Sequence, residues 1–397
     1  MLVKQIYNLV NDITNEVLGK EGILLEDLSN VVQVGDEVFN ANAQDNYVRS
    51  LVNHIGRVVF VDRKYMGSAP KVLMDGWEFG SVLEKVTMEL PQAEENESWE
   101  LEDRTSYDPN IFYKPQVSAK FFNGRVTFEV PISITEKQVK ESFSNAQQLN
   151  AFISMIYTAI ENSLTLKIDG LIRRTINNFT AETLFNAYNS GVTFSGVGNT
   201  RAINLLARYN EGRANPLTSA NALSDLDFLK FASAQMSIHV DRLREMSGLF
   251  NIGGKARFTP NDRLHVVMLS EFAKKADVYL QSDTYHNEFT RLPDYEKVGY
   301  WQGSGLNYDF ADTSKINVKT SNNNSVEASG ILCVMFDRDA LGVSNVDRRT
   351  TTQYNGKAEF FNNWYKYDAG YFNDFNENFI VFFIADTDES SSTESNE

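Results

Sequence analysis

Apolar residues recur at two different intervals along the first third of the chain. Between residues 3 and 18 they recur every three or four positions, which predicts an amphipathic helix that ends near Gly19. Residues 126–134 instead alternate between apolar and more polar side chains, which predicts a strand with one face toward solvent. Residues 82–90 supply a partner strand. We therefore expect a long β-hairpin, with the acidic, proline-bounded segment 91–115 as an excursion near its tip.

The longest helical signal lies between Leu149 and Phe179. Its apolar residues form one stripe at spacings of three and four, and the roughly 30 residues would make a rod of about 45 Å. Lys167, Arg173 and Arg174 interrupt any strict heptad repeat. The pattern therefore favours a helix laid along a sheet over a coiled coil.

The second half of the chain alternates between predicted helices and strands. An amphipathic helix carries the apolar residues from Leu229 to Met246 on one face, with Ser224 as its expected N-cap. A strand, a helix and a strand follow at residues 264–269, 270–280 and 331–336. This order predicts a compact α/β domain over about 215–340. Residues 379–385 contain no polar side chain, which predicts a central strand covered on both faces.

The first 65 residues and the long hairpin carry apolar residues, but too few to build a core of their own. A two-stranded hairpin is only marginally stable in water by itself. The pattern therefore indicates an arm and a hairpin that are covered by neighbouring copies of the chain.

Composition changes this picture less than the placement of charge does. The chain has 397 residues, 42% hydrophobic and 12% aromatic, which is ordinary for a packed globular protein. The net charge is −16, yet residues 89–108 contribute −7 and residues 386–397 contribute −5. The rest of the chain is close to neutral, so a nucleic-acid-binding protein with a basic face is disfavoured. No run of about 18 apolar residues occurs, so no membrane partner is expected.

No motif in the chain specifies catalysis, a metal site or a cofactor. The four histidines lack the spacing of a zinc-binding helix, and the single cysteine, Cys333, lies in the apolar run ILCVMF. The segment from Gly196 to Arg201 begins like a dinucleotide-binding fingerprint but lacks its third glycine. Carboxylates at 94–103 could pair for glycoside hydrolysis, but no pocket-forming pattern accompanies them. We therefore expect neither an enzyme nor a bound cofactor or metal.

The densest aromatic stretch is FFNNWYKYDAGYFNDF, residues 360–375. Exposed rings in such a stretch would form a platform on which sugars or bases stack. Rings that pack across strands or between subunits are the favoured interpretation, because aromatic residues are enriched where proteins meet.

Residues 329–386 read SGILCVMFDRDALGVSNVDRRTTTQYNGKAEFFNNWYKYDAGYFNDFNENFIVFFIAD. This stretch resembles the end of tailed-phage major capsid proteins with the Hong Kong 97 type fold. In that family an apolar strand ends in an Asp-containing turn with an ALG-like step, a polar excursion with arginines and aromatics follows, and the chain returns to a last strand. The arm, the hairpin, the long helix and the α/β domain also fall in the order of that family.

The resemblance implies an α+β fold of the Hong Kong 97 type, in which the long helix is the spine of a peripheral domain. It also implies a division of the chain into six parts. These are an N-terminal arm (1–65), an extended β-hairpin loop (66–135), a peripheral domain with the spine helix (136–214), an axial α/β domain (215–345), a return to the peripheral domain (346–385) and a disordered acidic tail (386–397).

The function that the resemblance implies is that of a major capsid protein. Such a protein self-assembles into hexamers and pentamers of an icosahedral phage head around double-stranded DNA. The implied partners are other copies of the chain, a portal protein and packaged DNA in loose, non-specific contact, in a virion assembled in the host bacterial cytoplasm. A separate scaffolding protein is expected, because only about 65 residues precede the extended loop. No covalent cross-linking is expected, since the lysines of the loop region match no family pattern.

Five residues are candidates for contacts between subunits: Trp77, Trp99 and Arg104 in the loop, and Trp364 and Tyr367 near the last strand. Two other classes of function remain open. One is a non-enzymatic, β-rich virion or surface protein that binds carbohydrate through the aromatics of 360–375. The other, weaker alternative is a glycoside hydrolase that uses the carboxylates at 94–103.

Overall fold

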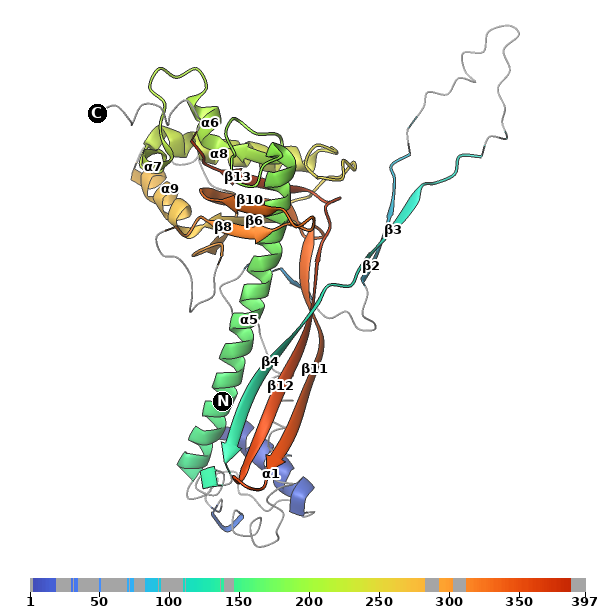
Figure 1. The fold of residues 1–397 in the computed structure, drawn as a ribbon, viewed down its shortest axis with the longest axis vertical. Coiled ribbons are helices and arrows are strands. Elements are labelled where there is room, and N and C mark those ends of the chain that lie inside the picture. Colours follow the sequence, from blue (N-terminus) through green and yellow to red (C-terminus); the bar gives the residue numbers. More distant parts are fainter. Residues whose placement is uncertain are drawn as a thin grey trace.

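The structure is a computed structural model of the chain. It describes residues 3–18, 30, 32–34, 50, 70, 72–74, 83–91, 93, 110, 112–135, 137–138, 146–282, 293–302 and 312–386. A long helix stands beside a long sheet, an α/β unit lies at one end of both, and a hairpin projects to the side (Figure 1). None of the helices in this described part combines the length and the apolar character that a bilayer crossing needs.

Helix α5 (Ala146–Tyr188) has 43 residues, which at 1.5 Å per residue makes it about 65 Å long. It confirms the helix predicted between Leu149 and Phe179 and continues beyond it. From Leu171 onward, only Arg174 and Asn186 of this helix are exposed. The extra length follows from this environment, because the last turns of α5 enter the α/β unit and are covered on nearly every side.

Three long antiparallel strands lie along α5 (Figure 1): β4 (Arg125–Thr135), β11 (Leu341–Asn355) and β12 (Phe360–Asn373). The sheet order is β1-β11-β12-β4, and the short strand β1 (Leu73–Met74) pairs parallel to β11. The alternation predicted for residues 126–134 is confirmed, because the apolar side chains of β4 face inward and the others face solvent. Since α5 contacts β4, β11 and β12, the expectation of a helix laid along a sheet is also confirmed.

Helix α1 (Val3–Leu18) lies at the end of the long sheet that is remote from the α/β unit (Figure 1). Its bounds confirm the helix predicted for residues 3–18. Val10 and Ile13 are fully buried within the chain, and α1 contacts α5. The expectation that the arm must be covered by neighbouring copies is therefore wrong for this helix.

The long hairpin expected between residues 82–90 and 126–134 does not form. Strand β2 (Leu83–Met88) pairs with β3 (Val117–Phe122), while β4 pairs with β12. The prediction erred because β3, with the sequence VSAKFF, lacks a clear alternation, whereas the true neighbour of β4 lies more than 200 residues further along the chain. A local pattern identifies strands but does not select between distant partners.

The α/β unit is built on a five-stranded sheet. Its order is β5 (Ala202–Asn204), β13 (Phe379–Phe383), β10 (Ile331–Asp337), β6 (Leu264–Leu269) and β7 (Glu296–Val298). The other elements of this unit are α6 (Leu205–Asn210), α7 (Ser219–Ala222), α8 (Leu226–Arg244), α9 (Ser270–Ser282), β8 (Ile316–Lys319) and β9 (Ser325–Ala328). Every residue of β10 and β13 is buried, which confirms the predicted central strand.

The strand pairing cuts across the expected division of the chain at three places, and one helix cap differs from the prediction. Strand β13 joins the α/β sheet, so residues 346–385 do not simply return to the peripheral part of the chain. Strand β5 also joins it from a position before residue 215, and β4 belongs to the long sheet and not to an extended loop over 66–135. Helix α8 is capped by Asp225 and not by Ser224, because the Asp225 carboxylate accepts a hydrogen bond from a backbone N–H of the first turn.

An aromatic stack joins α5 to the α/β sheet. The ring of Phe179 lies parallel to that of Phe379, with centroids 4.1 Å apart, and edge-on to Phe375 at 4.9 Å. Phe379 continues the stack to Phe336 on β10, at 5.7 Å. Because Phe179 is fully buried, this stack fixes the position of the helix relative to the sheet.

We expect Phe179→Ala to lower the apparent free energy of unfolding by about 3–5 kcal/mol, since it removes a buried ring and leaves a cavity at the joint. Leu166→Ala is the matched control, because Leu166 lies on the same helix and is 48% exposed. Its loss should stay within about 0.5 kcal/mol. Urea denaturation measures the free energy of unfolding of both variants. Equal losses would show that the aromatic stack contributes no more to stability than an exposed leucine.

Candidate interaction surfaces

The β2–β3 hairpin presents two chemically different faces. On one face Leu83, Lys85, Lys120 and Phe122 are half-buried against the rest of the chain. The opposite face carries apolar side chains that are more than half exposed: Val86 (60%), Met88 (53%), Val117 (59%) and Phe121 (64%). In Figure 1 the hairpin leads away from α5 and from both large sheets. It therefore has no core of its own behind this second face.

The inward face is held by a cluster of ion pairs. Lys85 Nζ lies 2.9 Å from Asp374 Oδ2 and 2.7 Å from Glu377 Oε1, and Lys120 Nζ lies 2.8 Å from Asp374 Oδ1. Arg257 Nε contacts the same Glu377 oxygen at 3.2 Å. The carboxylates of Asp374 and Glu377 are only 2% and 9% exposed, so water screens these pairs weakly.

We call the ion pairs of Asp374 and Glu377 the anchor of the hairpin. The two carboxylates owe their positions to the turn between β12 and β13. The backbone N–H of Asp374 donates to the Ala340 carbonyl at 2.7 Å, and the Asp374 carboxylate accepts the N–H of Asn376 at 3.2 Å. Gly253 lies directly against this turn, because a Cβ at that position would stand 2.0 Å from Asn376 Oδ1. A side chain at position 253 would therefore have to displace the Asn376 amide.

Two opposing effects set the charge of Asp374. Burial by itself raises the pKa of this carboxyl, but hydrogen bonds from Lys120 and Lys85 and the Lys85 charge lower it, so that its pKa lies below the ordinary value. Asp374 is therefore ionised at neutral pH, and the anchor is complete there. An aromatic contact between Phe122 and Phe372, with centroids 5.1 Å apart, lies on the same side of the hairpin.

The exposed apolar surface continues past the strands to the distal end of the hairpin. Leu90 is 65%, Phe112 82% and Tyr113 73% exposed. Together with Met88 and Pro115 they line a groove of about 810 Å³. Glu89, Lys114 and Gln116 line the groove as well, so it combines exposed apolar side chains with polar ones, as sites of interaction with another macromolecule do.

Trp77, Trp99 and Arg104, three of the five contact residues predicted from the sequence, lie outside the described residues, as do the carboxylates at 94–103. Trp364 is half-buried on the outer face of the long sheet, opposite Thr351 and Pro131. The acidic tail also falls outside them, except for Asp386. The carboxylate of Asp386 accepts hydrogen bonds from Ser219, so the first residue of the expected disordered tail is held in place.

Tyr367 packs inside the chain. It is 1% exposed, its ring lies 6.4 Å from that of Phe128, and the Arg348 guanidinium lies 4.9 Å from the ring centroid. In this conformation it offers almost no surface for a contact between subunits. No aromatic residue between 360 and 375 is exposed, so these rings pack across strands and do not form an open stacking platform.

Sequence reasoning missed the anchor. Lys85 and Lys120 are visible as loop lysines, but nothing in the sequence relates them to Asp374 and Glu377, which follow more than 250 residues later. The local sequence gives no clear signal either, because each lysine shares its strand face with one apolar residue and one hydroxyl, Leu83 and Thr87 in β2 and Phe122 and Ser118 in β3.

The described part of the chain contains no group of three or more histidine, cysteine, aspartate or glutamate side chains placed to hold a metal ion. Burial lowers the pKa of His239 to about 4 and raises the pKa of the Cys333 thiol well above its usual value. His239 is therefore neutral at physiological pH, and Cys333 is a buried thiol. These two groups are structural.

The chain was compared with known proteins. The family model of Phi29-like phage major capsid proteins matches residues 10–383, from within α1 to the end of β13. The major capsid protein of Bacillus phage GA-1 is 25% identical over 205 residues, which are 50% of this chain and 42% of that protein. The chain thus spans less than half the length of this curated relative.

Solved structures with a similar arrangement also come from phage particles. A chain in the capsid structure of Staphylococcus phage Andhra is 10% identical, with a TM-score of 0.49 over 82% of this chain and 86% of that one. A chain in the capsid structure of cyanophage P-SCSP1u is 11% identical, with a TM-score of 0.42 over 83% of this chain and 95% of that one.

Replacing Asp374 by asparagine should loosen the hairpin without unfolding the molecule. The variant leaves Lys85 and Lys120 without their shared counter-ion, so we expect the free energy of opening of the β2–β3 ladder to fall by about 2 kcal/mol. Amide hydrogen exchange in β2 and β3 should then accelerate roughly 30-fold. Exchange in β10 and β13 should be unchanged.

Asp241→Asn is the control for this experiment, because Asp241 pairs with Arg244 but is 75% exposed.

Low pH should have the same effect on the hairpin as Asp374→Asn, because it protonates the Asp374 carboxylate. A carboxyl whose pKa falls on folding stabilises the fold above its unfolded pKa of about 3.9, and this stabilisation is lost as the pH falls through the folded pKa. Hairpin protection, corrected for intrinsic exchange rates, should therefore persist from pH 7 to about pH 4 and decline below it. Loss of protection already near pH 6 would contradict this assignment.

Proposed function

Because this chain belongs to the family of Phi29-like phage major capsid proteins, we propose that it is the subunit from which a phage head is built. The observation that carries this proposal is the family match over residues 10–383, which spans both sheets, the long helix and the hairpin. A capsid subunit is a structural protein and part of the virion, which is consistent with a chain whose sequence contains no catalytic motif.

The outward face of the hairpin supports the proposal physically. Val86, Met88, Val117 and Phe121 are exposed in the single chain, and each stabilises an interface by about 1.5–3 kcal/mol when its side chain is fully buried. A second copy of the chain is the partner that a self-assembling subunit always has available. We therefore propose that this face, extended by Phe112 and Tyr113, covers a neighbouring subunit.

The finer arrangement follows the Hong Kong 97 type of fold. In this proposal α5 is the spine of the peripheral part, and the five-stranded sheet with its helices is the axial domain. Subunits associate into hexamers and pentamers that close an icosahedral shell around double-stranded DNA. Trp77, Trp99, Arg104 and Trp364 remain candidates for the contacts between them.

The partners proposed besides the chain itself are a separate scaffolding protein, a portal protein and DNA. Contact with DNA is loose and independent of sequence, because the acidic segments leave the rest of the chain close to neutral and a strong grip on phosphate needs an excess of lysine and arginine. Assembly takes place in the cytoplasm of the host bacterium.

Electron microscopy of the full chain, co-expressed with its neighbouring genes, tests this function. Regular shells, or rings of five or six subunits, are the expected result. A chain that stays monomeric under every condition of co-expression would contradict the proposal.

Met88→Asp and Val86→Asp should block assembly while leaving the fold intact. Both side chains are more than half exposed in the single chain, so the free energy of unfolding should change by no more than about 0.5 kcal/mol. A carboxylate buried at the interface without a partner should lower the yield of particles at least tenfold. Met88→Leu keeps the apolar area and should assemble normally, whereas equal yields for all variants would exclude this face from the contact.

A further inference from the structure

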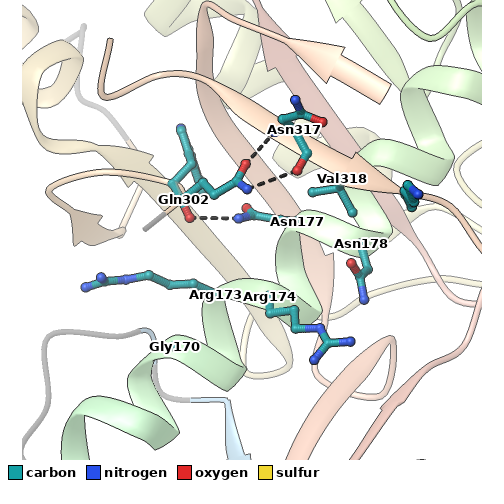
Figure 2. Close-up of a pocket in the computed structure, with 10 residues that line it drawn as sticks. Gly170, Arg173, Arg174, Asn177, Asn178, Gln302, Asn317 and Val318 are labelled. Carbon is teal, nitrogen blue, oxygen red and sulfur yellow. Dashed lines mark hydrogen bonds between the residues drawn. The ribbon is translucent and has the colours of Figure 1, made fainter. Parts of the chain in front are cut away.

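A cavity of about 420 Å³ lies between α5, the segment after β7 and strand β8. Arg173, Arg174, Asn177 and Asn178 line it from α5, and Gln302 and Asn317 line it from the other side. In Figure 2 the side chains of Arg173 and Arg174 extend in opposite directions. The wall on that other side is fixed, because Gln302 Nε2 donates to the Asn317 carbonyl at 2.9 Å and Gln302 Oε1 accepts the Asn317 backbone N–H. The cavity is therefore a formed and strongly polar site that the proposed function does not use.

Two of its cations are available to a ligand. Arg173 is 5% exposed and its guanidinium lies 4.1 Å from the centroid of the Tyr300 ring, so it is committed to the chain. Arg174 and Lys319 are both exposed, and within the described ranges neither forms an ion pair. Glu182, the carboxylate of the adjoining cavity, is engaged by the backbone N–H of Ser321 at 2.6 Å. This neutral donor leaves the negative charge of Glu182 in place, but the three cations Arg173, Arg174 and Lys319 outnumber it, so the net charge of the site is positive.

The cavity also contains an unused acceptor. Asn177 is 3% exposed, and its Nδ2 donates to the Trp301 carbonyl at 2.7 Å, which fixes the orientation of the amide. Its Oδ1 is buried and has no hydrogen-bond partner in the part of the chain that the structure describes. A buried oxygen of this kind is costly until a donor reaches it. The complete ligand therefore carries negative charges for Arg174 and Lys319 together with an N–H donor for Asn177.

We propose that this cavity binds the acidic segment 94–108 of a second copy of the chain. The inference rests on the proposed capsid function and names a contact within it. The segment holds seven carboxylates and one arginine in fifteen residues, which makes it complementary in charge to Arg174 and Lys319. Its backbone supplies N–H donors for Asn177. Phosphates of DNA satisfy the cations but offer no donor to that oxygen, so the polypeptide is the better match.

A second copy is the source because of where the hairpin points. Segment 94–108 is joined to the distal end of the β2–β3 hairpin, which leads away from α5 in Figure 1. The cavity opens beside α5 and β8 of the same chain. Docking the segment of one subunit into the cavity of the next would add a charged contact to the apolar contact made by the hairpin face.

Gly170 makes the site testable by steric means. It lines the cavity in the middle of α5, and a Cβ added there meets nothing within 4 Å. A side chain at this position therefore starts from open space beside the cavity. Removing the glycine also favours the helix, since glycine inside a helix is destabilising by roughly 0.5–1 kcal/mol relative to alanine.

The first experiment reverses charge in the full chain and scores particles by electron microscopy. The pair Arg174→Glu and Lys319→Glu should lower the yield of shells at least about tenfold while thermal unfolding of the unassembled chain stays unchanged. Adding Glu94→Lys, Glu95→Lys, Glu97→Lys and Glu100→Lys to that pair should restore the yield. The control pair Lys274→Glu and Lys357→Glu makes the same change in net charge at exposed positions elsewhere, and its yield should stay close to that of the wild type.

The second experiment fills the cavity. Gly170→Phe should reduce the yield of shells by a similar factor, whereas Gly170→Ala should assemble normally.

Each outcome decides for or against the proposal. Normal yields for both the charge-reversed pair and Gly170→Phe, with wild-type shells present, would overturn this contact and leave the capsid function standing. If the charge-reversed pair gives a normal yield of shells but these shells no longer retain DNA, the cavity would be assigned to phosphate. That result would also overturn the proposed contact. Absence of shells from the wild type would instead overturn the capsid function and this contact together.

Discussion

One helix is shared by two sheets, and the shape of the molecule depends on that sharing. The first part of α5 is covered on one side by the long antiparallel sheet, while its last turns are enclosed by the α/β unit. The stack of Phe179 on Phe379 joins these environments, since it ties the helix to β13, an interior strand of the second sheet. The buried side chains of both sheets and of this helix, which is about 65 Å long, form one continuous core, so the helix fixes how the two sheets lie relative to each other.

The two faces of the hairpin rely on different physical interactions. Its inward face relies on charges, with Lys85 and Lys120 on the buried carboxylates of Asp374 and Glu377. Its outward face is apolar and exposed. The charged hydrogen bonds join particular partners at a short distance, so they suit the face that sets an angle. Apolar burial is non-directional, so it suits the face that meets a partner.

Local patterns predicted the elements well and their pairing poorly, for physical reasons. The helices α1 and α5 and the strands β6, β10 and β13 follow from periodicity and burial that a short window contains. The pairing of β4 with β12 and the ion cluster at Asp374 depend on residues more than 200 positions apart, and β13 pairs with β10 and β5, neither of which is its neighbour along the chain. The burial of Tyr367 in the single chain could not be predicted either, because an aromatic ring in a strand has the same sequence pattern whether it faces the core or a partner.

Because of the anchor at its base, the hairpin becomes ordered when the chain folds and not when subunits associate. An arm that hangs freely must lose its conformational entropy at the moment of association, and that loss weakens every contact it makes. Here Asp374 and Glu377 restrict the hairpin while the chain folds. The subunit is preorganised, so the free energy released when the hairpin is covered goes into holding the neighbours together.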